Sequence, residues 1–160
     1  MFRSCAPYSE DGVHPTAGLT LAGLANVYRR QDRIAEAQAL FERALRTSQD
    51  ALGPDHVYNS TSLNGLAIVH QTQGRVSDAR PLLERALAIR EHAHGPDHPD
   101  VAESLFNLGM NLQSTGNTGE AETLLRRALR IKEGTHGPDH PETIEIHTAL
   151  GALGEATASA

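Results

Sequence analysis

The residues in this chain that most suggest chemistry are its nine histidines. Two pairs stand four residues apart, His94 with His98 and His136 with His140. Two imidazoles one helical turn apart can share a zinc ion. Here Gly-Pro separates the members of each pair, which predicts a loop, so the two rings are not expected to share a helical face. The repeated histidine is better explained as a helix cap or loop anchor, and neither a metal nor a cofactor is expected.

The sequence gives equally little evidence for other kinds of reactive site. Serine, histidine and aspartate are present, but no glycine-flanked nucleophile, phosphate-binding loop or paired-carboxylate motif accompanies them, so an enzyme is not expected. Cys5 is the only cysteine, which excludes an intrachain disulfide and a cysteine-based zinc site. No single residue or short motif therefore predicts a function.

Charge and hydropathy narrow the class of protein. The net charge of −6 comes from residues of mixed sign and argues against a nucleic-acid partner. No stretch has the length of a secretory signal or a membrane span, which predicts a cytoplasmic protein without a membrane partner. Thirteen arginines against one lysine indicate a GC-rich coding genome.

The chain is organised as a repeat with a period of 42 residues. Residues 53–94 and 95–136 are identical at 18 of 42 paired positions, and both begin Gly-Pro-Asp-His. A fixed period of this kind is the signature of a stacked array. The predicted organisation is a disordered lead-in over 1–13, a repeat domain over 14–155 with repeats at about 11–52, 53–94, 95–136 and a half repeat at 137–155, and a tail over 156–160.

Each repeat has two segments with apolar residues at spacings of three and four, which predicts two amphipathic helices. In the first repeat the leading segment carries Leu21, Leu24, Ala25 and Tyr28 on its predicted buried face. Breaks follow at Gln31-Asp32 and at the equivalent Gln73-Gly74 and Thr115-Gly116. Helices joined by so short a connection lie antiparallel as a hairpin.

The third repeat carries a recognisable motif. Ser-Leu-Phe-Asn-Leu-Gly-Met-Asn-Leu at 104–112, followed by Gly116, Ala121, Leu125 and Ala128, resembles a tetratricopeptide repeat. The 42-residue period and the Gly-Pro-Asp-His loop resemble the repeats of kinesin light chain and its many bacterial relatives. The resemblance covers residues 14–154 and implies an all-α, right-handed α-solenoid of antiparallel helix hairpins, with three repeats plus one additional helix.

In such an array the first helices of the repeats line the concave side. The resemblance implies that a peptide lies along this groove. The candidate binding residues are those on the first helices that point away from the hairpin: Asn26, Arg29, Arg30, Asn64, Ile68, Gln71, Phe106, Asn107, Met110 and Gln113.

Three chemistries are represented in this set. Asparagine amides both donate and accept hydrogen bonds and can hold the backbone of an extended peptide. Phe106, Ile68 and Met110 can form an apolar pocket, although Ile68 and Met110 can equally pack between repeats. Arg29 and Arg30 can bind an acidic peptide end, but arginines in a last helical turn also interact favourably with the helix dipole, which we favour.

The predicted function is therefore a protein interaction module that binds a peptide or protein segment in the groove. An alternative is a structural or regulatory module that self-associates through its last helix or controls an effector domain. That helix carries Ile144, Ile146, Leu150 and Leu153, more apolar residues than one buried stripe requires. A homo-oligomer is accordingly a second possibility for the partner.

Overall fold

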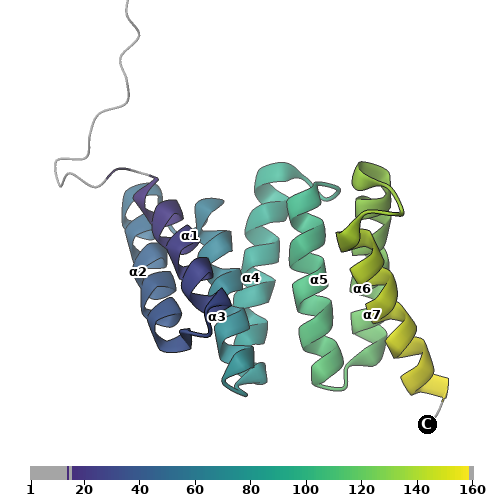
Figure 1. The fold of residues 1–160 in the computed structure, drawn as a ribbon. Helices are drawn as coiled ribbons and strands as arrows, with labels where there is room; N and C mark the ends of the chain where they lie inside the picture. Colours follow the sequence, from purple (N-terminus) through teal and green to yellow (C-terminus); the bar gives the residue numbers. More distant parts are fainter. Residues whose placement is uncertain (1–13, 15, 159–160) are drawn as a thin grey trace, which may run out of the picture.

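The structure is a computed structural model that describes His14 and residues 16–158, and these residues form an array of seven helices without strands (Figure 1). The predicted lead-in, 1–13, lies outside the described residues. The last helix continues into the stretch predicted as a tail. The all-α class and the helix-pair repeat are confirmed. The helices are α1 (Ala17–Arg30), α2 (Ile34–Leu52), α3 (Tyr58–Thr72), α4 (Val76–His94), α5 (Pro99–Ser114), α6 (Thr118–His136) and α7 (Pro141–Ala158).

The breaks inside each repeat form where the sequence predicts them. Gly74 and Gly116 adopt φ values of 76° and 83°, in the left-handed region that glycine enters without steric cost. Asp32 takes the same place in the first repeat at φ 61°, which aspartate tolerates better than most side chains. Each turn reverses the chain, so that α1 packs on α2, α3 on α4 and α5 on α6.

The Gly-Pro-Asp-His loops connect one hairpin to the next, and their histidine is a helix cap, as expected. His98 Nδ1 accepts a hydrogen bond from the Asp100 N–H at 3.2 Å, at the start of α5. The equivalent bond is 3.3 Å long at His56, and the same length at His140. Each bond satisfies a backbone donor that the first turn of a helix leaves without a partner.

The stack curves because its two layers of helices are spaced differently. Cα atoms of successive first helices approach within 8 Å in the pairs α1–α3, α3–α5 and α5–α7. Over the part of the chain that the structure describes, α2, α4 and α6 do not approach one another this closely. The first helices therefore form the inner, concave layer and the second helices the outer, convex layer of a superhelix.

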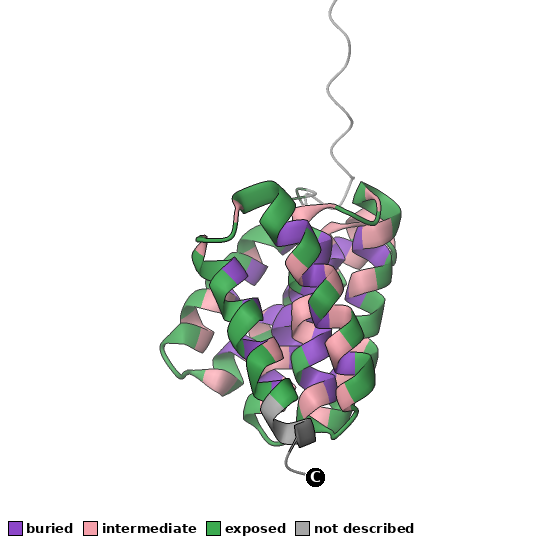
Figure 2. Cartoon of the chain, turned by 90° about the vertical axis from the view of Figure 1, so that its right-hand side faces the viewer, coloured by how far each residue is buried: buried purple, intermediate pink, exposed green. Residues whose placement is uncertain are grey.

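Small residues allow the close packing inside each hairpin. Ala25 and Ala67 are fully buried. A Cβ added at the equivalent Gly109 would stand 2.9 Å from two side-chain carbons of Leu125 on α6. Buried residues lie between the helices and exposed ones on the outer surface (Figure 2). The core is therefore thin and runs along the stack, as the repeat predicts.

One core prediction is wrong. Leu24 was expected on the buried face of the first helix, but 43% of its surface is exposed. The equivalent Leu66 is buried because it packs into the preceding hairpin, beside Phe41 and Ala44 of α2. No preceding hairpin exists among the described residues to cover Leu24, so this position faces outward. The repeat pattern thus predicts on which face of the helix a residue lies, but not whether a neighbouring hairpin covers that face.

His70 occupies a partly buried position in α3 that holds Tyr28 in the first repeat and Leu112 in the third. Burial lowers the pKa of His70 below its ordinary value of 6.5, and the positive charge of Arg75 adds to this effect. The neutral imidazole is thus the form that the fold favours. The unfolded chain consequently binds more protons than the native state once the pH falls below about 6.5.

We expect this difference to make the protein less stable in mild acid. Neutral His70 contributes fully to the free energy of unfolding at pH values above the pKa of the unfolded state. This contribution is lost as the pH falls toward the lower pKa of the native state. Melting temperatures measured between neutral pH and about pH 5 should therefore fall less steeply in His70→Leu than in the wild type. His92→Leu, at an exposed position of α4, is the control. An unchanged pH profile in His70→Leu would contradict this prediction.

Candidate functional site

The concave layer contains a hollow between α1 and α3 with a volume of about 250 Å³. Five of the ten predicted groove residues line it, together with Thr61, Gly65, Arg90 and Glu103. The five are Asn26, Arg29, Arg30, Asn64 and Ile68. The structure thus brings together residues of two repeats that the sequence places about 40 positions apart.

Two further hollows continue along the same layer between α5 and α7. One, of about 260 Å³, is lined by Phe106 and Asn107 among others. The other, of about 350 Å³, is lined by Phe106, Met110 and Gln113 and by residues of α7. Gln71 lines none of the hollows described. Phe106 borders both hollows at this end of the array.

The predicted residues differ in how they present their side chains. Met110 is 38% exposed, which suits a groove residue better than a core residue. Asn64 is only 4% exposed, and its Nδ2 donates to Ser104 Oγ of α5 at 3.5 Å. Its Oδ1 is buried without a hydrogen-bond partner among the described residues. Asn64 therefore forms the floor of the hollow, and a ligand reaches its amide only if the side chain moves.

The charge of the lining changes along the groove. Arg29 and Arg30 lie at the α1 end, where Arg29 Nη2 donates to Asn26 Oδ1 at 3.5 Å. At the other end the lining includes the ion pair of Lys132 with Glu142 and, in addition, Glu145 of α7, which supplies the negative charge that this pair does not compensate. The groove thus presents positive charge at one end, negative charge at the other, and the apolar ring of Phe106 near the negative end.

Two buried cations join successive repeats, and sequence reasoning missed both. Arg90 of α4 is 6% exposed and donates from Nη1 to the Asp100 carbonyl and to Glu103, both at 2.8 Å. Lys132, at the equivalent position of α6, is also buried and bonds to Glu142 of α7. The sequence could have indicated them, because Arg90 and Lys132 stand at equivalent positions on a helix face that is otherwise apolar.

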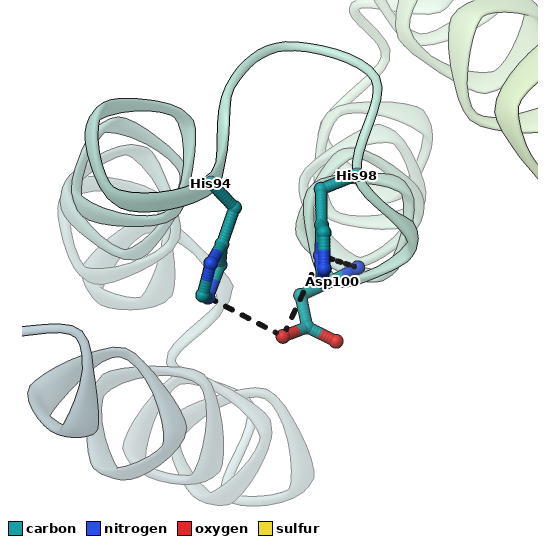
Figure 3. A group of neighbouring side chains, drawn as sticks. All are labelled: His94, His98 and Asp100. Carbon is teal, nitrogen blue, oxygen red and sulfur yellow. Dashed lines mark hydrogen bonds and ion pairs between the residues drawn. The ribbon is translucent and has the colours of Figure 1, made fainter.

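The histidines flanking the second interrepeat loop lie side by side (Figure 3). The rings of His94 and His98 stack with centroids 4.4 Å apart and planes inclined by 22°. As expected, the two rings do not share a helical face, because His94 ends α4 and His98 caps α5. The loop nevertheless folds back and brings the end of α4 against the start of α5. Both rings face the carboxylate of Asp100, at 3.6 Å from His94 Nε2 and 3.7 Å from His98 Nδ1.

Comparison with known proteins agrees with this architecture. The sequence profile described as Tetratricopeptide repeat matches residues 16–92 and 61–134. The chain belongs to the tetratricopeptide repeat family. No curated protein matches it significantly in sequence. None of the helices that the structure describes is long and apolar enough to cross a membrane.

Solved structures refine the type of tetratricopeptide repeat. Nearly identical TPR-like repeats of the kinesin light chain type from Podosopora anserina superpose with a TM-score of 0.80 at 27% identity, covering 91% of this chain and 69% of that one. BtubC (BKLC) from P. vanneervenii gives a TM-score of 0.81 at 24% identity, covering 91% of this chain and 58% of that one. The array is therefore of the kinesin light chain type, as the 42-residue period predicts.

A third structure shares the fold at lower identity. The first TPR of Spaghetti (RPAP3), solved bound to the HSP90 peptide SRMEEVD, has a TM-score of 0.67 at 18% identity. The match covers 91% of this chain and 97% of that one.

Proposed function

We propose that this tetratricopeptide array binds an extended segment of a partner protein along its concave layer and catalyses no reaction. The observation that carries the proposal is the row of hollows along the first helices, which continues from α1 to α7. Their linings combine charged, amide and apolar side chains. A groove that mixes apolar area with a few polar groups suits recognition of a peptide.

Structures of the same fold support the choice of ligand. The first TPR of Spaghetti is bound to a short HSP90 peptide, and SycD of Yersinia enterocolitica is a chaperone of type III secretion translocators. At 18% and 16% identity these structures share the fold alone, so their own partners are not transferred to this chain.

The lining predicts the chemistry of the segment and its direction. An acidic residue is expected beside Arg29 and Arg30, and a basic residue beside Glu145, for which no ion pair is found among the described residues. A large apolar side chain is expected against Phe106. Opposite charges at the two ends of a groove favour one orientation of the segment over the other.

Binding should be tested with peptides selected from a random display library against the intact chain. We expect the selected peptides to lose at least tenfold in affinity when Phe106 is replaced by alanine, which corresponds to about 1.4 kcal/mol. Arg30→Glu should weaken the peptides with an acidic residue at one end. Both effects are read from fluorescence anisotropy titrations.

The matched control is Arg43→Glu, which makes the same charge change at an exposed position of the convex α2. It should leave the affinity unchanged. Equal binding by wild type and Phe106→Ala, or equal losses in Arg30→Glu and Arg43→Glu, would remove the assignment of binding to the concave layer.

A second candidate function is assembly through α7. Ile144 is 52% exposed, and a Cβ at Gly151 would meet nothing within 4 Å, whereas the equivalent Gly109 packs against α6. The face of α7 that corresponds to a hairpin contact is thus open and can receive a helix of another copy. Sedimentation of the wild type and of Ile144→Glu distinguishes the two functions: assembly requires a larger species that the substitution dissociates.

A further inference from the structure

The stacked histidines at the junction of α4 and α5 form a compact set of ligands with one carboxylate. One potential ligand atom from each of His94, His98 and Asp100 lies within 4.8 Å of the other two. None of the three side chains is buried: their exposed fractions are 30%, 40% and 51%. They lie on one side of the loop that joins the second repeat to the third, with the carboxylate between the two helices (Figure 3).

We propose that His94, His98 and Asp100 bind one Zn²⁺ ion at this junction. Two imidazoles and a carboxylate are a common donor set for zinc and leave the remaining position of a tetrahedron open to water. Zinc bonds of about 2.0–2.1 Å place the donor atoms of a tetrahedral site roughly 3.3 Å apart. The 3.6 Å and 3.7 Å separations from Asp100 Oδ2 need only a small contraction to reach this spacing. The two rings, stacked at 22°, must also turn, because an imidazole binds a metal in the plane of its ring and both planes must meet at the ion.

Two reactions compete with the ion. His98 Nδ1 already accepts the Asp100 N–H, so a metal bound to that nitrogen must displace this capping bond, or the ring must rotate to present its other nitrogen. Protons compete for both rings because an imidazolium has no lone pair for a metal. We therefore expect binding to be reversible and to weaken in acid.

The third repeat supplies an internal comparison. His136 and His140 occupy the equivalent positions, with ring centroids 4.7 Å apart, and Glu142 takes the place of Asp100. There the carboxylate bonds to the ammonium of the buried Lys132. A fixed positive charge at the carboxylate opposes a second cation, so this junction is not expected to bind zinc.

The experiment is a calorimetric titration of ZnCl₂ into the full chain, without an affinity tag, in a buffer that does not chelate metals. The Cys5→Ser background removes the only thiol, which could otherwise bind zinc. We expect one ion per chain, and a loss of at least tenfold in affinity in His94→Ala and in Asp100→Asn. Circular dichroism of each variant establishes that the helices are retained.

His136→Ala is the matched control and should bind zinc as the Cys5→Ser background does. Absence of a saturable heat in that background, two equivalent ions per chain, or equal losses in His94→Ala and His136→Ala would each overturn the site. Because none of the three ligands lines the concave hollows, this result is independent of peptide binding.

Discussion

Replacing Gly65 by alanine is expected to lower the free energy of unfolding by about 1–3 kcal/mol, the usual cost of forcing extra volume into a packed core. Gly65 of α3 faces Phe41 of α2, and an added Cβ would stand 2.2 Å from the ring carbon Cε1 and 2.3 Å from Cζ. Phe41 is fully buried, so its ring cannot move aside freely. The first two repeats must separate slightly to accept the methyl group.

The first repeat provides the control. Gly23 occupies the equivalent position in α1, where a Cβ would meet nothing within 4 Å. Gly23→Ala should therefore be neutral or stabilising, because alanine favours a helix over glycine by about 1 kcal/mol. Chemical denaturation followed by circular dichroism measures both variants. Equal stability of Gly65→Ala and Gly23→Ala would show that the contact with Phe41 does not limit the packing.

A second substitution tests the cause directly. The next repeat carries leucine at the position of Phe41 and asparagine at the position of Gly65, namely Leu83 and Asn107. A smaller side chain on the second helix thus accompanies a larger one on the following first helix. In a Phe41→Leu background, Gly65→Ala should cost much less than in the wild type, giving a coupling energy on the order of 1 kcal/mol.

Replacing Arg90 by alanine should have an effect of similar size, about 2–3 kcal/mol, because several hydrogen bonds to a charged donor are lost at once. The guanidinium of Arg90 bridges α3 and α5. Its Nε donates to Ser60 Oγ at 3.1 Å, and its Nη1 donates to Ser104 Oγ at 3.1 Å and to the Asp100 carbonyl at 2.8 Å. Removal of the side chain takes the arginine donor from all three acceptors, and Ser104 Oγ keeps only the long bond from Asn64 Nδ2.

Two further variants, measured by thermal and chemical denaturation, serve as comparisons for Arg90→Ala. Arg90→Lys keeps the charge, as the equivalent Lys132 does, and should restore part of the stability. Arg85→Ala removes an exposed arginine of the same helix that donates to the Pro54 carbonyl at 3.0 Å and lies 4.0 Å from the Asp55 carboxylate. It should change the free energy of unfolding by no more than about 1 kcal/mol. Similar losses in Arg85→Ala and Arg90→Ala would argue against a specific role of the buried guanidinium.

The repeat made most of the architecture predictable. The helix breaks follow from Gly74 and Gly116, because the left-handed turn that ends a helix favours glycine. The hairpin packing follows from small residues at equivalent positions, such as Ala67 and Gly109. Leu24 was misassigned because a period reports which face a residue occupies, whereas its burial also depends on a neighbouring hairpin.

The groove was predictable as a surface but not in the detail of its side chains. Nine of the ten predicted residues line the concave hollows. Burial of Asn64 and enclosure of Arg90 depend on the angle between successive hairpins, which no local pattern encodes. The stacking of His94 on His98 depends likewise on the path of a three-residue loop.

Glu103 has two roles, and they are mechanically connected. Its carboxylate lines the hollows on both sides of α5 and also pairs with Arg90, which holds the second hairpin against the third. A basic side chain that entered the groove would compete with Arg90 for this carboxylate and so loosen the joint between the hairpins. Binding of a peptide at one repeat would then change the angle between successive hairpins, and so alter the superhelical pitch at the neighbouring repeat.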